Sequence, residues 1–149
     1  LSDRLFPQHG KLTWEQTYVL GYNVPQRTIS GGDAREKGPM TVRLPEHTDD
    51  SEVTLNLCLS PSSDFTGGEL MLGEERGEKA AAEMTSRELK QGRVIIHSGR
   101  RMHSVSEVSS GERYVMIQWT RSEALRERLC PCCFLNGRDG GCICGPTWN

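Results

Sequence analysis

Alternating apolar and polar residues mark the clearest strand of the chain. From Val53 to Leu59 every odd position is apolar and every even position is polar or small. This period of two is typical of a strand that buries one face, and we expect one strand to span residues 46–60. Other segments rich in β-branched or aromatic residues also predict strands. They cover residues 14–24, 69–72, 92–97, 102–108 and 112–120.

The segments between these strands carry the signals of turns and loops. Gly and Pro punctuate residues 25–45 and 61–68, and Ser109–Gly111 predicts a turn into the last strand. Residues 73–91 are charged and predict a solvated excursion, with a short helix at 80–82 or a lid as alternatives, and residues 121–129 look helical. Short strands at close spacing favour an all-β fold, a sandwich or a double-sheet jelly roll with few short helices.

Composition narrows the class of protein. A chain of 149 residues is long enough for one domain with a sizeable core. Its 35% hydrophobic and 26% charged residues are typical of a globular protein. The net charge of −2 argues against nucleic-acid binding, and no apolar run approaches the ~18 residues of a membrane span. No signal peptide is visible, which favours an intracellular location, although the chain also lacks an initiator Met.

Five of the six cysteines crowd into the last twenty residues. Cys130, Cys132 and Cys133 precede a glycine-rich loop, and Cys142 and Cys144 follow it. Paired thiolates suit Zn(II), but this spacing differs from the usual C-x2-C pairs. Zinc, local disulfides and free thiols therefore remain open. We expect residues 1–123 to form the main domain, and residues 124–149 to form a helical turn and this cysteine-rich tail.

Two histidines and an aspartate suggest a metal site. His47 and Asp49 lie two residues apart, and His103 follows 54 residues after Asp49. Side chains two apart on a strand point to the same face. Two imidazoles and one carboxylate, with further positions open, form the facial triad of non-haem Fe(II) oxygenases. The spacing alone is weak evidence, because each histidine by itself is more often a polar core or surface residue.

The surrounding motifs resemble a known family. The chain is similar to the 2-oxoglutarate/Fe(II)-dependent dioxygenases, in the branch of prolyl 4-hydroxylases and lysyl hydroxylases, over roughly residues 5–133. The stretches that carry the resemblance are YVLGY (18–22), HTDDSEVTLNLCL (47–59), DFTGGEL (64–70), GRVIIHSGRRMHSV (92–105) and GERYVMIQW (111–119). The resemblance implies a double-stranded β-helix core, with Fe(II) and 2-oxoglutarate as metal and cosubstrate and L-ascorbate as reductant.

The resemblance also assigns roles to single residues. His47, Asp49 and His103 match the iron ligands of the family. Arg113, ten residues after His103, matches the cation that binds the distal carboxylate of 2-oxoglutarate. Arginine suits this role because its planar guanidinium presents a fork of donors to a carboxylate. Tyr22 matches a tyrosine of the cosubstrate pocket, with an ordinary core tyrosine as the alternative.

The strand period bears on three further polar residues. If the alternation runs unbroken from His47, then Thr54 and Asn56 point away from the ligands, unless a bulge shifts the phase. Asn56 therefore enters the candidate site through the family resemblance alone. His97 is expected to end a strand and not to bind metal.

The most direct interpretation is an enzyme that hydroxylates a peptide or protein side chain, releasing succinate and CO2. A small-molecule substrate is also compatible with the sequence, because substrate choice resides in loops without a readable code. One alternative is a non-catalytic jelly-roll binding module that works through its cysteine-rich tail. Another is a cupin-like Zn or Mn enzyme. The sequence carries no signal for an oligomeric state.

Overall fold

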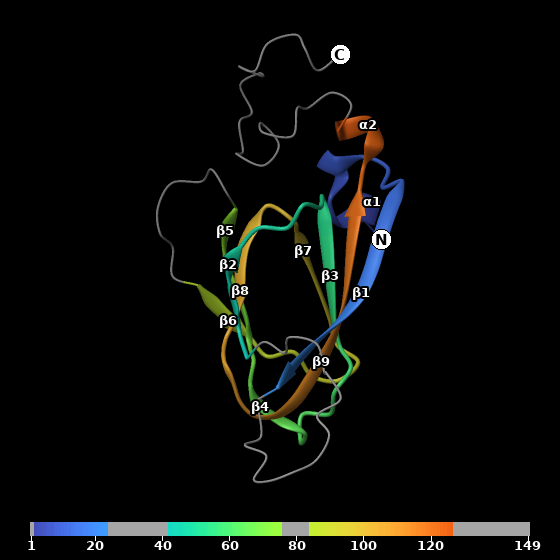
Figure 1. Cartoon of the computed structure of the whole chain (residues 1–149). Coiled ribbons are helices and arrows are strands. Elements are labelled where there is room, and N and C mark those ends of the chain that lie inside the picture. Colours follow the sequence, from blue (N-terminus) through green and yellow to red (C-terminus); the bar gives the residue numbers. More distant parts are fainter. Residues whose placement is uncertain (1, 24–41, 76–83, 127–149) are drawn as a thin grey trace, which may run out of the picture.

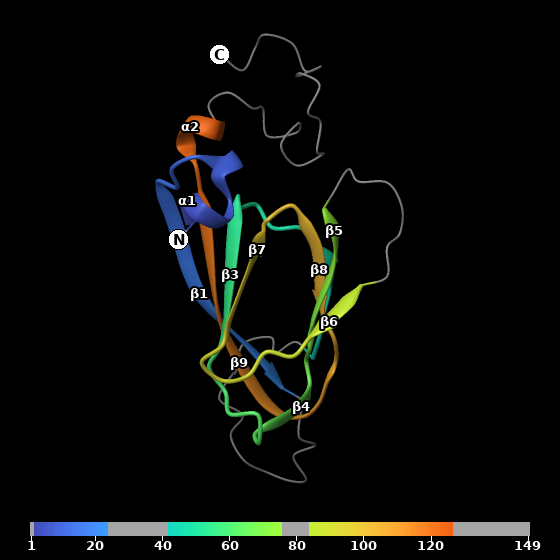
Figure 2. The ribbon, with the colours of Figure 1, turned by 180° about the vertical axis from the view of Figure 1, so that it is seen from behind.

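Two antiparallel sheets face each other in the computed structural model of the chain (Figures 1 and 2). The structure describes residues 2–23, 42–75 and 84–126. The larger sheet has the order β1 (Trp14–Asn23), β9 (Val108–Arg121), β3 (Val53–Cys58) and β7 (Val94–Ser98), with β4 (Phe65–Gly67) paired to β9. The smaller sheet has the order β2 (Leu44–His47), β8 (Arg101–Val105), β5 (Leu70–Glu75) and β6 (Thr85–Arg87). The all-β, double-sheet prediction is confirmed.

Helices play a minor part in the described residues. They are α1 (Ser2–Leu5), the 3-10 turn η1 (Pro7–His9) and α2 (Glu123–Arg126). None of these has the length and apolar character that crossing a bilayer requires. The helix expected over residues 121–129 is described only as far as Arg126. The possible helix at 80–82, most of the expected loop at 25–45 and the whole cysteine cluster lie outside the described residues.

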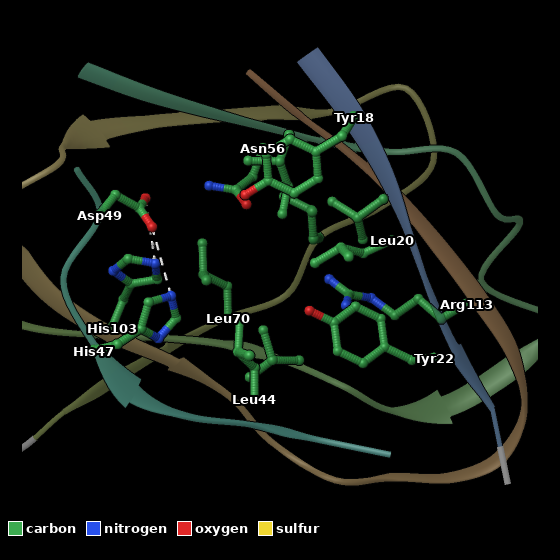
Figure 3. Close-up of a pocket in the computed structure, with 14 residues that line it drawn as sticks. Tyr18, Leu20, Tyr22, Leu44, His47, Asp49, Asn56, Leu70, His103 and Arg113 are labelled. Carbon is green, nitrogen blue, oxygen red and sulfur yellow. Dashed lines mark ion pairs between the residues drawn. The ribbon is translucent and has the colours of Figure 1, made fainter. Parts of the chain in front are cut away.

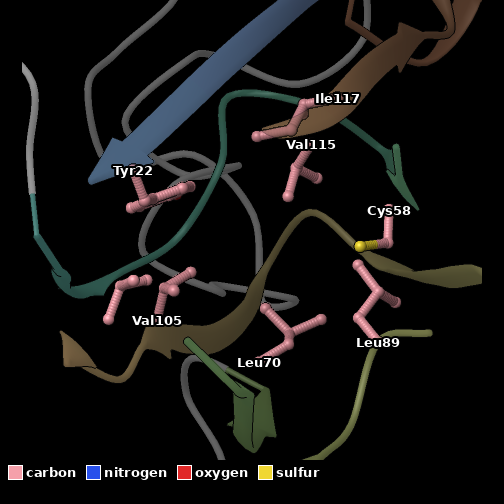
Figure 4. Close-up of a cluster of buried hydrophobic side chains, with 8 residues drawn as sticks. Tyr22, Cys58, Leu70, Leu89, Val105, Val115 and Ile117 are labelled. Carbon is pink, nitrogen blue, oxygen red and sulfur yellow. The ribbon is translucent and has the colours of Figure 1, made fainter. Parts of the chain in front are cut away.

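The hydrophobic core fills the space between the two sheets (Figure 4). The larger sheet contributes alternate residues of β1 and β9, because side chains on one face of a strand recur every two positions. Smaller-sheet strands close the core from the other side. The buried cluster consists of Tyr22, Cys58, Leu70, Leu89, Val105, Val108, Val115 and Ile117. Burying such side chains supplies the main driving force for folding.

The single strand expected over residues 46–60 is in fact two strands in different sheets. β2 ends at His47 in the smaller sheet, and β3 begins at Val53 in the larger one. Residues 48–52 cross between them. This segment (TDDSE) has no apolar residue, so it has no alternating face that could continue a sheet. The prediction of one continuous strand was wrong, and the parity count based on it fails as well.

Residues Ser109–Gly111 form part of β9, where the sequence predicted a turn. Gly111 pairs with Phe65 of β4 and has a φ of 78°. A Cβ atom at Gly111 would lie 1.8 Å from the carbonyl oxygen of Asp64. The glycine therefore serves a close approach of two backbones within a paired strand. The charged segment 73–91 likewise contains a short strand, β6, that the sequence did not predict.

Gly111→Ala should destabilise the fold by on the order of 3 kcal/mol or more, because the new Cβ meets backbone that cannot move aside. Gly92→Ala is the matched control. Gly92 has a φ of 73° but has no atom within 4 Å of the added Cβ, so it should cost only about 1–2 kcal/mol. Urea unfolding of both variants measures the difference. Equal losses would show that the approach to Asp64 does not constrain the fold.

Candidate functional site

His47, Asp49 and His103 meet at one end of the space between the sheets (Figure 3). His47 ends β2 and lies directly opposite His103 of the neighbouring strand β8. Asp49 reaches them from the crossing segment 48–52. One carboxylate oxygen, Oδ1, lies 3.5 Å from Nε2 of His47, and Oδ2 lies 3.5 Å from Nε2 of His103. The candidate ligand atoms of all three residues fall within 4.8 Å of one another.

Both imidazoles are held in the same orientation by the backbone. Nδ1 of His47 donates to the carbonyl of Pro45 at 2.8 Å, and Nδ1 of His103 donates to that of Arg101 at 2.9 Å. A carbonyl oxygen can only accept, so Nδ1 carries a proton, and in the neutral imidazole Nε2 keeps its lone pair. Nε2 faces Asp49 in both residues. This arrangement fits a metal ion, since ligating histidines commonly donate their other ring nitrogen to a carbonyl.

The electrostatics of the three residues also suits a cation. Burial alone would raise the pKa of Asp49, but hydrogen bonds from His47 and Thr54 and the nearby His103 hold this pKa below its usual value. Burial lowers the pKa of His103. A hydrogen bond to Asp49 raises the pKa of His47. The centre thus favours a charged carboxylate beside a neutral imidazole, the protonation state that metal ligands require.

A pocket connects this cluster to Arg113. Its lining is mostly apolar. In Figure 3, Leu70 lies between the histidines and the guanidinium, with Leu20 above the guanidinium and Leu44 below Leu70. The polar residues that sequence analysis selected, Tyr22 and Asn56, both line it. The full lining comprises Tyr18, Leu20, Tyr22, Leu44, His47, Asp49, Asn56, Leu70, Leu89, His103, Val105, Arg113, Val115 and Ile117.

Arg113 is a buried cation with free hydrogen-bond donors. Only 2% of its surface is exposed. Within the described part of the chain, its Nε and Nη1 atoms have no hydrogen-bond partner. Its Cζ lies 5.2 Å from the ring centre of Tyr22 and 5.9 Å from that of Phe65. Burial lowers the pKa of Arg113, and the nearby Tyr22 opposes this shift. Buried donors without partners are costly, so this end of the pocket suits an anion.

Thr54 and Asn56 face the site, contrary to the parity argument. Thr54 donates to Oδ2 of Asp49 at 2.6 Å. Asn56 lines the pocket and donates through Nδ2 to Nε2 of His97 at 3.0 Å. The parity count failed because the chain leaves the sheet at residues 48–52 and begins a new alternation at Val53. The even positions of β3 therefore point inward.

His97 supports the site without joining the ligand cluster. It lies in β7, donates through Nδ1 to the carbonyl of Ser98 at 2.8 Å, and accepts from Asn56 at Nε2. Burial lowers the pKa of His97 to about 4, so the imidazole is neutral. Its ring centre lies 4.7 Å from that of His103. His97 therefore packs behind one member of the cluster and orients the amide of Asn56.

Tyr18 was not among the site residues predicted from the sequence. This residue lines the pocket, and burial, followed by the charge of Asp49, raises its pKa to about 12. Its hydroxyl thus stays protonated and can donate a hydrogen bond. The period of two along β1, which gives Tyr18, Leu20 and Tyr22 the same face, was the signal that would have found it.

Ion pairs hold the crossing segment against α2. Glu52, 1% exposed, accepts from the backbone N–H of Ser122 and from Nε of Arg126 at 2.8 Å. Asp50 pairs with Arg121 and with Arg126, each at 2.7 Å. Both acidic residues follow Asp49 closely in sequence. The end of β9 and the last residue of α2 therefore fix the segment that carries the carboxylate of the cluster.

Comparison with known proteins identifies relatives of this chain. No protein-family model matches the chain. The mouse (Mus musculus) protein "2-oxoglutarate and iron-dependent oxygenase domain-containing protein 2" is 40% identical over 88 residues, which cover 58% of this chain and 25% of that protein. A "PKHD-type hydroxylase" of Idiomarina loihiensis is 36% identical over 83 residues, 51% of this chain and 35% of the relative.

The chain is related to the 2-oxoglutarate and iron-dependent oxygenase domain proteins. The resemblance that the sequence motifs indicated is confirmed. The family implies Fe(II) and 2-oxoglutarate, and the His47, Asp49 and His103 cluster has the composition of the facial triad. The chain spans about a quarter of the length of the mouse relative, 25%.

A solved structure has the same fold as this chain. A crystal structure of a prolyl 4-hydroxylase from Phytophthora capsici has a TM-score of 0.55 and 18% sequence identity, and the match covers 91% of this chain and 45% of that one. At this level of identity the likeness concerns architecture. It supports the double-stranded β-helix that the sequence resemblance implied.

Glu52→Gln should lower the free energy of unfolding by about 3 kcal/mol, because it removes a buried charge partner and can set an amide N–H against that of Ser122. Asp50→Asn is the matched control. It weakens pairs with the same Arg126, but Asp50 is 49% exposed, so the loss should stay below ~1 kcal/mol. Chemical denaturation of the two variants checks this. Similar losses would contradict the special role of the buried pair.

Proposed function

We propose that this domain is an Fe(II)- and 2-oxoglutarate-dependent dioxygenase that hydroxylates a peptide or protein side chain and releases succinate and CO2. The observation that carries the proposal is one pocket with two complementary ends. A His-Asp-His cluster lies at one end, and a buried arginine with free donors lies at the other. A dicarboxylate cosubstrate that binds metal through one end and a cation through the other matches this pair.

His47, Asp49 and His103 would hold the Fe(II). Two neutral imidazoles and one carboxylate leave coordination positions for 2-oxoglutarate and O2. The bound iron and cosubstrate would supply an oxidation in which one oxygen atom enters succinate and the other enters the substrate. The side chain of His47 is 34% exposed, whereas that of His103 is 5% exposed. Entry from the side of His47 is therefore the more open route.

Arg113 would bind the distal carboxylate of 2-oxoglutarate. Its Nε and Nη1 atoms carry N–H groups without a partner among the described residues, and each can make a charge-assisted hydrogen bond to a carboxylate oxygen. The apolar lining between the two ends would exclude water, which strengthens an ion pair. Tyr22 stands beside the guanidinium and would contact the same carboxylate. Asn56 would contact the cosubstrate near the metal, and L-ascorbate would keep the iron ferrous.

The relatives support the choice of reaction. Proteins similar to this domain are named hydroxylases, among them the PKHD-type enzyme. The intact His-Asp-His cluster argues against a binding module without catalysis. Succinate release in the presence of candidate peptides, with the mass increase of one oxygen atom, separates these two functions. We propose a main domain of residues 1–123, because β9 ends at Arg121, followed by residues 124–149, of which Arg126 still contacts the main domain through Asp50 and Glu52.

Anaerobic addition of Fe(II) and 2-oxoglutarate should produce a visible metal-to-ligand charge-transfer band. His103→Ala should abolish this band, because it removes one of only two imidazoles. His9→Ala, which removes a mostly buried histidine outside the cluster, is the control and should leave the band intact. Absorption spectroscopy under nitrogen is the measurement. Failure of the wild-type protein to show the band would refute the proposed function.

Arg113→Ala should raise the 2-oxoglutarate concentration for half-maximal band intensity roughly 10- to 150-fold. Losing a charge-assisted contact costs ~1.5–3 kcal/mol. The 2-oxoglutarate requirement of Arg113→Lys should fall between those of the wild type and Arg113→Ala, because lysine keeps the charge but lacks the planar fork. Titration of the band with 2-oxoglutarate at fixed Fe(II) gives these values. An unchanged requirement in Arg113→Ala would remove Arg113 from the cosubstrate site.

A further inference from the structure

Asp49 is the single carboxylate of the cluster, and no strand fixes its position. His47 and His103 both lie in paired strands, whereas Asp49 lies in the crossing segment between β2 and β3. A carboxylate can rotate and can bind a metal through one oxygen or through both. Something outside the backbone ladder must therefore fix which oxygen Asp49 presents.

A buried chain of hydroxyl groups ends on this carboxylate. Thr54 Oγ1 lies 2.6 Å from Oδ2 of Asp49 and 2.7 Å from Oγ of Ser51. An ionised carboxylate only accepts, so Thr54 donates its one hydroxyl proton to Asp49. Ser51 must then donate to Thr54. Exposures of 0% for Ser51, 1% for Thr54 and 4% for Asp49 keep water from competing for these bonds.

The chain of hydroxyl groups is anchored in rigid backbone at both ends. Thr54 lies in β3, between His97 of β7 and Trp119 of β9. On the other side, Gly99 packs against Ser51 so closely that a Cβ atom there would lie 2.0 Å from the Ser51 carbonyl oxygen. The N–H of Asp49 donates to the Gly99 carbonyl at 2.8 Å. The hydroxyl of Thr54 therefore has little freedom to follow a rotating carboxylate.

We propose that Thr54 is a positioning residue for the metal centre, an inference that rests on the proposed function. Both oxygens of Asp49 face an imidazole, Oδ1 at 3.5 Å from Nε2 of His47 and Oδ2 at 3.5 Å from Nε2 of His103. The hydroxyl of Thr54 occupies Oδ2, so Asp49 would offer the metal Oδ1. The carboxylate then binds through one oxygen. That leaves free a coordination position which a bidentate carboxylate would occupy. Threonine suits the role because its β-branched side chain has few rotamers.

Metal binding without 2-oxoglutarate tests this role directly. Thr54→Val keeps the shape and removes the hydroxyl, and it should weaken anaerobic Co(II) and Fe(II) binding about 10- to 100-fold, the usual effect of losing a partner that orients a ligand. The Co(II) d–d absorption bands should also shift, because the freed carboxylate can change its coordination. Thr54→Ser keeps the hydroxyl and should restore both affinity and spectrum.

Thr120→Val is the matched control for loss of a threonine hydroxyl. Thr120 Oγ1 donates to the Val53 carbonyl at 2.8 Å, in the same sheet, and this hydroxyl makes no bond to Asp49. The control should bind Co(II) like wild type, even where its melting temperature falls as far as that of Thr54→Val. Should Thr54→Val fail to fold, Thr54→Ala against Thr54→Ser provides a second comparison, with and without the hydroxyl.

The outcomes separate the two proposals. Weaker binding and a shifted spectrum in Thr54→Val, restored in Thr54→Ser and absent in Thr120→Val, support the positioning role. Binding in folded Thr54→Val as tight as in Thr120→Val, with an unchanged spectrum, overturns this role and leaves the proposed metal centre intact. A wild-type protein that binds neither metal overturns the proposed function itself, and the positioning role with it.

Discussion

The passage of residues 48–52 from the smaller sheet to the larger one is the constraint on which the site depends. A facial cluster needs a carboxylate beside two imidazoles. Here the imidazoles come from two neighbouring strands, and the carboxylate comes from the segment that follows one of them. The crossing segment leaves β2 at His47 and reaches β3 at Val53, so Asp49 lies where the two sheets meet. Asp50 and Glu52 then tie this segment to Arg121 and Arg126.

The pocket has a buried negative charge at one end and a buried positive charge at the other. Each costs stability unless a ligand of opposite charge pairs with it. Asp49 is buried beside imidazoles that can share a cation, and Arg113 is buried with donors that can receive an anion. Unpaired buried groups of this kind cost stability. The same low-polarity surroundings that impose this cost would strengthen the binding of an iron ion and a dicarboxylate.

The fold class and the four main candidate residues were predicted from the sequence, but the face on which Thr54 and Asn56 lie was predicted wrongly. The strands around Tyr22 and His97 followed from β-branched and aromatic runs. The error at Thr54 and Asn56 came from counting alternation through a segment that leaves the sheet. The same limit applies at Gly111, where a positive φ inside a paired strand carries the same sequence signal as a turn.

The sequence by itself determined which functional groups are available: two imidazoles, a carboxylate and a guanidinium, in an order typical of one family. Its alternation of apolar and polar residues also predicted the strands. Side-chain type and period are local properties, so a single chain reveals them. Only the tertiary structure decided that His47 lies opposite His103, that Thr54 donates to Asp49 and that Tyr18 shares the pocket. Those relations join residues from different strands and sheets, and their distances depend on how the sheets pack.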